Sequence, residues 1–419
     1  MSGSGGWLRG FFRTKGKGSD PASFPYVRER PIGPASFAED NNDFALAMYG
    51  QLRQQGGNLF FSPFSIRTAL SMTQVGARGE TAAQMEETLR ISSSDEKQHV
   101  GFAEIIQRLN AAGGGEYEMS VANSLWCQDG APLQPGFLDV IARHYGGGMN
   151  VVDFGRGAEA ARAINLWVEH KTRKKIPMLI PLDSLGAETR LVLVNAVYFK
   201  GMWVLQFRRT DTGDERFHLE GGGTVRAPLM YQHGEVRYLQ AAGYQAVDLI
   251  YQGGELSMLV FLPDRRDGLG NLERTLSPQI LHDCMERMNR REVKLFLPRF
   301  KITWGTVNLH DELTALGMTL PFNRSQADFS GINGHQPPNE EALFVSAVFH
   351  KAFVEVNEEG TEAAAATAVH AVAGAALRPF KPPPIPIFLA DHPFLFAIRD
   401  RKSGAILFLG RVADPTRGS

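Results

Sequence analysis

Residues 358–374 read Glu-Glu-Gly-Thr-Glu-Ala-Ala-Ala-Ala-Thr-Ala-Val-His-Ala-Val-Ala-Gly. Helix propensity alone makes the four consecutive alanines the start of a short exposed helix. The segment nevertheless follows a strand-like run over residues 349–356 and precedes a proline-rich run over residues 378–386. Because no glycine or proline lies between Gly360 and Gly374, the composition is compatible with a loop, a helix or a strand.

Small side chains suit this segment to entering the middle of a closed β-sheet. Alternate side chains of a strand point to the same face, and those that would point inward are Thr361, Ala363, Ala365 and Thr367. A charge or a proline at these positions would oppose burial, through its desolvation cost or a lost hydrogen bond. Glu362 would point outward and stay solvated. At ~3.3 Å per residue, residues 361–374 span about 46 Å, enough to cross a domain.

The rest of the chain predicts a mixed α+β protein with large antiparallel sheets. Apolar periodicity predicts helices over residues 37–52, 63–72, 81–89 and 160–175. Strands are predicted over residues 121–126, 191–199 and 293–302, and hairpins over residues 247–262 and 394–409. The run 191–199 is so continuously apolar that we expect a central strand covered on both faces.

The amino-acid composition indicates how the chain is divided into domains and which kinds of binding partner it disfavours. Residues 1–35 are rich in Gly, Ser, Pro, Lys and Arg and predict a flexible tail, whereas residues 36–419 contain no linker and predict one domain. A net charge of −1 creates no field that attracts nucleic acid or an anionic membrane. No apolar run is long enough to span a membrane. The N-terminus lacks the apolar stretch of a signal peptide, so the sequence alone predicts a cytoplasmic protein, or one exported by a route it does not reveal.

Motifs for catalysis and for cofactor or metal binding are absent. The chain contains no Gly-x-Ser-x-Gly, His-Glu-x-x-His or Cys-x-x-Cys pattern, so we predict no enzyme, no cofactor and no metal site. Cys127 and Cys284 are interpreted as core thiols, with a disulfide between them as the alternative. A solvated helix end, with a polyanion site as the alternative, is predicted for Lys171, Arg173, Lys174 and Lys175.

Several segments together resemble the serpin family of protease inhibitors, in its inhibitory, bacterial-like type. Besides the segment quoted above, they are residues 58–66 (Asn-Leu-Phe-Phe-Ser-Pro-Phe-Ser-Ile), 193–203, 297–302, 327–332 and 391–396, and they occur in the family's order. The resemblance implies a serpin fold: large mixed or antiparallel β-sheets A, B and C, covered by about eight or nine α-helices. Residues 358–387 would form the hinge and an exposed reactive-centre loop.

The resemblance also implies a mechanism of suicide inhibition. A target serine protease attacks the exposed loop and forms an acyl-enzyme. The cut loop then inserts into sheet A as a new central strand, which drags the protease across the molecule and distorts its active site. The native fold would be a metastable monomer held by kinetics and able to form loop–sheet polymers. A cysteine protease is a second class of target, and the extracellular space is the family's common alternative location.

The resemblance assigns three groups of site residues by position. The hinge comprises Glu358, Glu359, Gly360, Thr361, Glu362, Ala363, Ala364, Ala365, Ala366 and Thr367. The shutter cluster, which lies beneath the sheet and controls its opening, comprises Ser62, Ser65, Asn195 and His350. The breach cluster, where insertion begins, comprises Trp203, Arg299 and Glu358, with Glu358 and Arg299 as an ion pair. Ordinary buried polar groups paired with one another are the alternative interpretation of the shutter cluster.

Counting along the family's hinge places the scissile bond at Gly374–Ala375. The flanking residues Val372, Ala373 and Ala376 are also small, which suits elastase-like or subtilisin-like proteases with shallow primary pockets. Residues 375–392 are longer and richer in proline than is usual for the family. Arg378 is therefore an alternative bait, for a trypsin-like protease.

Two other functions compete with inhibition. The first is a non-inhibitory serpin that acts as a binding protein or chaperone; such relatives usually carry bulky, charged or proline residues at inward hinge positions, and this hinge carries none. The second is a hydrolase in which Ser62 or Ser65 pairs with His350 as a catalytic dyad. The apolar segments around these residues predict a buried and inaccessible cluster instead.

Overall fold

The computed structural model describes residues 35–92, 95–111, 117–146, 148–361 and 384–418. Within these ranges the α-helices are α2 (Ala35–Leu52), α3 (Pro63–Gln74), α4 (Gly79–Thr88), α5 (Asp95–Ala111), α6 (Pro135–Tyr145), α7 (Gly157–Lys171), α8 (Leu269–Thr275), α9 (Pro278–Arg287), α10 (His310–Ala315) and α11 (Ser330–Asn333). Short 3-10 helices are η1 (Phe154–Arg156), η2 (Arg209–Asp211) and η3 (Leu320–Phe322). The two shortest α-helices, α10 and α11, have only six and four residues, so the described helices slightly outnumber the eight or nine expected.

Many strands of the described part follow one another without a helix between them. They are β1 (Leu59–Phe61), β2 (Tyr117–Gln128), β3 (Gly148–Val152), β4 (Leu191–Met202), β5 (Gly213–His218), β6 (Thr224–Ala241), β7 (Tyr244–Ile250), β8 (Leu256–Pro263), β9 (Asn289–Pro298), β10 (Phe300–Asn308), β11 (Val345–Val356), β12 (Gly360–Thr361), β13 (Ile387–Leu389), β14 (Phe394–Asp400) and β15 (Ile406–Val412). The fold is therefore mixed α+β, as the sequence predicts.

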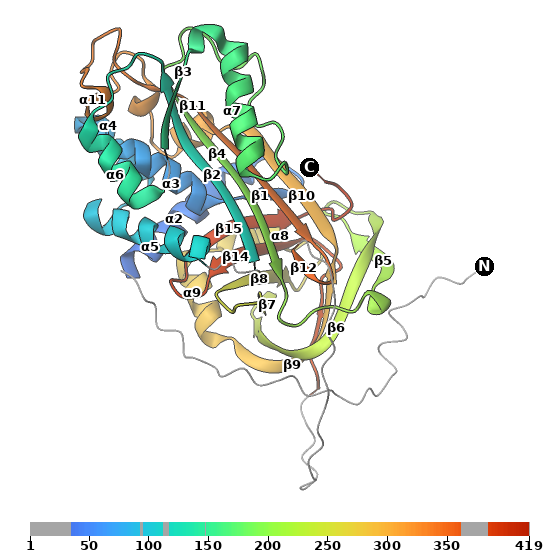
Figure 1. Ribbon diagram of the computed structural model, residues 1–419. Coiled ribbons are helices and arrows are strands. Elements are labelled where there is room, and N and C mark those ends of the chain that lie inside the picture. Colours follow the sequence, from blue (N-terminus) through green and yellow to red (C-terminus); the bar gives the residue numbers. More distant parts are fainter. Residues whose placement is uncertain (1–34, 93–94, 112–116, 147, 362–383, 419) are drawn as a thin grey trace.

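Six of the strands form one sheet, in the order β10-β11-β12-β4-β2-β3, which crosses the centre of Figure 1. At its middle, β4 and β11 pair in parallel over eight residue pairs, from Leu191–Val345 to Tyr198–Phe353. We call this parallel contact the seam. Both strands have antiparallel partners on their other sides, β2 and β10 respectively.

Both faces of β4 are covered, which explains its continuously apolar sequence. Leu191, Leu193 and Val197 point into the main core, and they alternate with Val192 and Val194, which point into a second core. Figure 1 shows α7 in front of this sheet and α3 behind it. The predicted central strand over residues 191–199 is thus confirmed and extends to Met202.

The other sheet runs in the order β1-β15-β14-β8-β7-β6-β9-β13, with β5 paired to β6. The predicted hairpins appear as β7–β8 and β14–β15, both antiparallel. The eighteen-residue strand β6 pairs with both β7 and β9. Through these pairings the described strands outside the six-stranded sheet form one nine-stranded sheet, with β5 beside β6.

The predicted single strand over residues 293–302 is wrong. The chain forms two strands there, β9 in one sheet and β10 in the other, separated by Arg299. Pro298 has no backbone N–H to continue the ladder of β9, and the backbone N–H of Arg299 donates to the carbonyl of Pro228 at 2.9 Å. Alternating apolar residues continue through this bend, so periodicity alone could not locate it. Among the described residues, no helix has both the length and the apolar character needed to cross a membrane.

Candidate functional site

One end of the seam already holds the first residues of the predicted hinge. There β12 lies between β11 and β4: Thr361 pairs with Val356 on one side and with Gly201 on the other, while Gly360 pairs with Met202. Both pairings are antiparallel. We call this the hinge end of the seam. Beyond it, β4 and β11 are in direct contact, so the sheet is closed ahead of β12.

Gly360 is required by the close approach of β12 to β4. A Cβ atom at this position would lie 2.0 Å from the carbonyl oxygen of Gly201 and 2.5 Å from the Cα of Met202. These atoms belong to the backbone of a central strand and cannot move aside. Any other residue would therefore push β12 out of the sheet.

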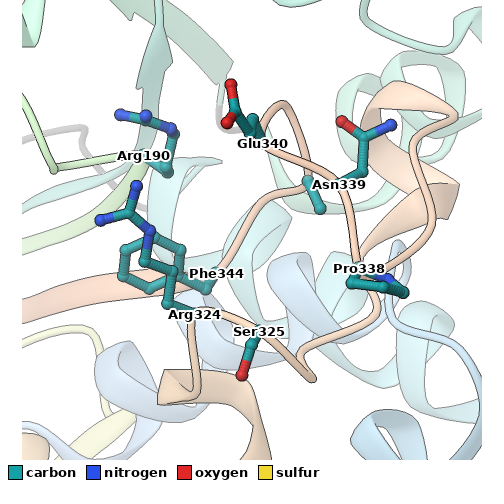
Figure 2. A pocket seen from close by; sticks show the side chains of 8 residues that line it. Arg190, Arg324, Ser325, Pro338, Asn339, Glu340 and Phe344 are labelled. Atoms are coloured by element: carbon teal, nitrogen blue, oxygen red, sulfur yellow. The ribbon is translucent and has the colours of Figure 1, made fainter.

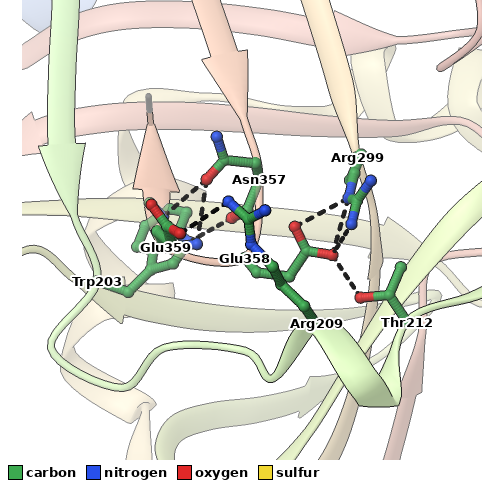
Figure 3. Close-up of polar contacts among 8 residues, drawn as sticks. Trp203, Arg209, Thr212, Arg299, Asn357, Glu358 and Glu359 are labelled. Atoms are coloured by element: carbon green, nitrogen blue, oxygen red, sulfur yellow. Dashed lines mark hydrogen bonds and ion pairs between the residues drawn. The ribbon is translucent and has the colours of Figure 1, made fainter. Parts of the chain in front are cut away.

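Glu358 anchors the hinge through a nearly buried carboxylate. Its side chain is only 3% exposed, and Arg299 donates to it from Nε at 2.8 and 2.9 Å and from Nη2. The hydroxyl of Thr212 donates to the same carboxylate. Burial raises the pKa of Glu358, but the hydrogen bonds from Arg299 and Thr212 outweigh it and hold the pKa below its usual value. Figure 3 shows both partners at the Glu358 carboxylate: Arg299 comes from the bend between β9 and β10, and Thr212 from the residue before β5.

Trp203 and the turn before β12 complete this end of the sheet. The indole Nε1 donates to the carbonyl of Asn357 at 3.1 Å, and the ring stacks on Tyr251 with centroids 4.5 Å apart. The Asn357 side chain accepts from the backbone N–H groups of Glu359 and Gly360. The structure thus places Trp203, Arg299 and Glu358 around one turn, which Figure 3 displays.

The four residues of the shutter cluster meet beneath the middle of the seam. Ser62 caps α3 by accepting from the N–H of Ser65, and its hydroxyl donates to the carbonyl of Leu407 at 2.7 Å. The Nδ2 group of Asn195 donates to the hydroxyl of Ser65. Asn195 is paired with His350 across the seam, and their side chains are hydrogen-bonded. Helix α3 and its N-cap are therefore hydrogen-bonded to both strands of the seam: Ser65 to Asn195 on β4, and Ser62 to His350 on β11.

The hydrogen bonds of His350 fix its tautomer. The backbone N–H of Ser62 can only donate, so Nε2 of His350 accepts from it at 3.2 Å. Nδ1 then carries the proton and donates to Oδ1 of Asn195. Complete burial lowers the pKa of His350 to about 3, so the ring is neutral at pH 7. A neutral, fully buried imidazole without access to solvent is poorly suited to the dyad chemistry considered above.

Asn123 is a member of this cluster that sequence reasoning missed. It lies on β2 directly opposite Asn195, and its Oδ1 accepts from Asn195 Nδ2 and from the hydroxyl of Ser65 at 2.7 Å. Asn123, Asn195 and His350 thus form one polar row across three neighbouring strands. The only available signal was a polar residue inside the predicted strand 121–126, which also fits a solvent-facing position.

The turn after α7 covers the opposite face of the seam near the hinge end. Tyr198 and Phe353, the last pair of the seam, have ring centroids 5.8 Å apart. The ammonium of Lys175 lies 5.5 Å from the Tyr198 ring centroid and 6.0 Å from that of Phe353. Arg173 forms an ion pair with Glu118 at 2.9 Å. Two of the four basic residues thus contact side chains of the sheet, and the choice between a solvated helix end and a polyanion site stays a prediction.

Several predicted site residues lie outside the described ranges. They are Glu362, Ala363, Ala364, Ala365, Ala366 and Thr367 of the hinge, Gly374 and Ala375 of the predicted scissile bond, and Arg378. The tail over residues 1–34 also lies outside them. Cys127 and Cys284 are both free and buried, so they are core thiols and not a disulfide. Among the described residues, no group of three or more His, Cys, Asp or Glu side chains is placed to hold a metal ion.

Comparison with known proteins gives a consistent picture. A family model described as Serpin (serine protease inhibitor) matches residues 39–415. An uncharacterized serpin-like protein of Thermococcus kodakarensis is 40% identical over 378 residues, which cover 90% of this chain and 85% of that protein. The leukocyte elastase inhibitor of Homo sapiens is 39% identical over 386 residues, covering 90% and 98%. The crystal structure of tengpin, a thermophilic serpin in its native state, has a TM-score of 0.81 at 26% identity, covering 93% of this chain and 96% of that one.

Proposed function

The chain belongs to the serpin family, and on this premise we propose that it is a suicide inhibitor of a serine protease whose bait is the loop that follows β12. Serpins are a family of protease inhibitors. The finer proposal concerns the mechanism of inhibition, the bond that is cut and the class of protease that is inhibited. The six-stranded sheet is the one that would receive the loop.

The observation that carries the proposal is the position of β12 at the hinge end of a parallel seam. Parallel pairing is slightly less stable per residue than antiparallel pairing. A loop that continues in the direction of β12 would run antiparallel to both β4 and β11. Insertion would therefore replace one parallel ladder by two antiparallel ladders, and the added hydrogen bonds and burial would drive it.

Insertion requires the seam to open by one strand spacing, about 4.8 Å. The contacts that resist opening are the His350–Asn195 hydrogen bond on one face and the Tyr198–Phe353 ring contact, covered by Lys175, on the other. These contacts hold the uncut protein in a state that is kinetically rather than thermodynamically stable. In this proposal the contacts of the shutter cluster resist the separation of β4 and β11. The separation starts at the breach cluster.

The cut is proposed at Gly374–Ala375. The protease's serine oxygen would bond to the carbonyl carbon of Gly374, the peptide bond to Ala375 would break, and Ala375 would leave with a new amino group. Small residues on both sides of this bond favour an elastase-like or subtilisin-like enzyme. The 39% identity to a protein named leukocyte elastase inhibitor supports the same choice.

Incubation of the purified protein with elastase, subtilisin and trypsin tests the proposal. We expect a covalent complex that survives denaturing electrophoresis with elastase or subtilisin. Mass spectrometry should find a released fragment that begins at Ala375, whereas a fragment that begins at Pro379 would indicate the Arg378 bait. Cleavage by all three proteases without any complex would contradict inhibition and favour a binding or chaperone role.

A matched pair of hinge variants separates insertion from recognition of the bait. Ala365→Arg places a charge at an inward position, and Ala364→Arg places the same charge at an outward one. We expect the first variant to be cut as a substrate without complex formation, because burying the guanidinium would halt insertion. The second should still form the complex. Equal behaviour of the two variants would rule out strand insertion in this register.

A further inference from the structure

A groove lies at the far end of the seam, opposite the hinge end. The seam begins there with Leu191 on β4 and Val345 on β11. The residues directly before them, Arg190 and Phe344, line the groove together with Arg324 and Glu340. Figure 2 shows the side chains of Arg190 and Arg324 on the same side of the groove, with Glu340 on the loop that closes it.

The two arginines have capacity to bind a further anion. Arg190 donates from Nη1 to the backbone carbonyls of Ala187 and Thr189, at 2.8 and 3.1 Å. Among the described residues it has no carboxylate partner. Arg324 forms an ion pair with Glu188, but both side chains are largely exposed, at 59% and 73%. Such an exposed pair contributes little stability and is readily exchanged for another partner.

The hydrogen bonds of β12 set the register in which a longer inserted strand would continue. Gly360 lies opposite Met202 and Thr361 opposite Gly201, and each further residue of the loop moves one residue back along β4. Residue 372 would then lie opposite Arg190. Counted along β11 from the Thr361–Val356 pair, residue 373 would lie opposite Phe344. Residue 373 is thus the first to pass the ends of both strands, which begin at Leu191 and Val345, and residue 374 follows it.

We propose that this groove is a receiving site for the new α-carboxylate that Gly374 acquires when the cut loop is released from the protease. Hydrolysis of the acyl ester adds the hydroxyl of water to the Gly374 carbonyl carbon, returns a proton to the protease's serine oxygen and leaves a carboxylic acid that ionises at neutral pH. Arg190 and Arg324 bind this carboxylate by charge-assisted hydrogen bonds. The site rests on the proposed insertion and deepens it, because it fixes where the inserted strand ends.

The receiving site also distinguishes the two candidate baits. A loop cut after Gly374 would end in the groove, whereas one cut after Arg378 would carry its carboxylate four residues past it. In the second case the arginines would face uncharged backbone. The register of β12 and the points at which β4 and β11 begin therefore favour the Gly374–Ala375 bond, independently of any protease's preference.

Synthetic peptides test the site on the intact, uncut protein. An acetylated peptide of residues 362–374 is annealed to the protein with either a free C-terminal carboxylate or a C-terminal amide. We expect the acid to dissociate about tenfold more slowly than the amide, the range of a charge-assisted hydrogen bond, and to raise the thermal transition further. A peptide of residues 362–378 should show no difference between its acid and its amide.

Two variants assign the difference to the arginines. In Arg190→Gln/Arg324→Gln we expect acid and amide to dissociate alike, whereas Glu340→Gln, which removes an anion from the same groove, should retain or increase the preference for the acid. If the acid and the amide bind the wild-type protein but dissociate at equal rates, the receiving site is overturned. The binding of the peptides would in that case still support the proposed insertion. If neither form of the peptide raised the thermal transition, both the receiving site and the insertion would be overturned.

Discussion

At the scale of single residues, we expect His350 to make the closed seam sensitive to acid. Its pKa is about 3 in the folded protein and about 6.5 in an unfolded chain. A histidine whose folded pKa is lowered stabilises the fold above pH 6.5, and this contribution is lost as the pH falls from 6.5 toward 3. Between pH 7 and pH 5 the loss is about 2 kcal/mol.

We therefore expect the thermal transition of the uncut protein, at a fixed heating rate, to fall between pH 7 and pH 5. The variant His350→Gln keeps a polar side chain but cannot titrate. It should be less stable than the wild type at pH 7 and should lose much of the pH dependence. If wild type and variant decline in parallel over this range, other groups are responsible for the acid sensitivity.

Glu358 is predicted to prevent premature opening of the seam. In Glu358→Ala, Arg299 loses its carboxylate partner and the turn before β12 loses its anchor. We expect loop–sheet polymers to form on the order of ten times faster on gentle heating, because one partner of a largely buried charge pair has been removed. The rate is measured by native gel electrophoresis.

The control for this prediction is Glu355→Ala, which removes a nearby ion pair with Lys301 that is more exposed than the Glu358–Arg299 pair. It should polymerise at close to the wild-type rate. If the Glu358→Ala protein polymerised no faster than Glu355→Ala, the ion pair between Glu358 and Arg299 would not be what slows the opening of the seam.

The site residues differ in how far the sequence could reveal them. The family resemblance assigns Ser62, Asn195 and His350 to one cluster, and the structure brings them together beneath the seam; their role in its opening stays a prediction. Asn123 could not be found, because its role depends on the pairing of β2 with β4. Strand pairing joins residues far apart in sequence, and no local pattern encodes it.

At the scale of elements, β12 depends on a glycine. The variant Gly360→Ala would place a Cβ atom against the backbone of β4, so we expect β12 to leave the sheet. The same clash would persist during insertion, and more inhibitor would be consumed per protease molecule inactivated. Titration of protease activity measures this stoichiometry. Gly50→Ala in α2, where nothing lies within 4 Å of the added atom, should behave as the wild type.

The elements themselves were predictable to different degrees. β4 was found from its apolar run because burial on both faces leaves a strong local signal. The boundary between β9 and β10 was missed because the alternating pattern continues through Arg299 while the chain passes from one sheet to the other. β12 has only two residues, and its place between β4 and β11 is set by partners that lie more than a hundred residues apart in sequence.

At the scale of the whole molecule, the proposed inhibition requires that the uncut fold is not the most stable arrangement of the chain. In the proposed mechanism, the parallel seam, the polar row beneath it and the covering turn after α7 hold β4 and β11 together until the loop is cut. The division into a tail of residues 1–35 and a single domain of residues 36–419 stays a prediction at this scale. So do the monomeric state and the protease that is trapped.

The most direct test is to heat the uncut and the loop-cut protein side by side and follow unfolding by circular dichroism. Limited proteolysis at the bait, verified by mass spectrometry, supplies the cut sample. We expect the cut protein to unfold at a much higher temperature, because the inserted loop would be a central strand with antiparallel neighbours on both sides. An unchanged or lower transition after cleavage would contradict loop insertion.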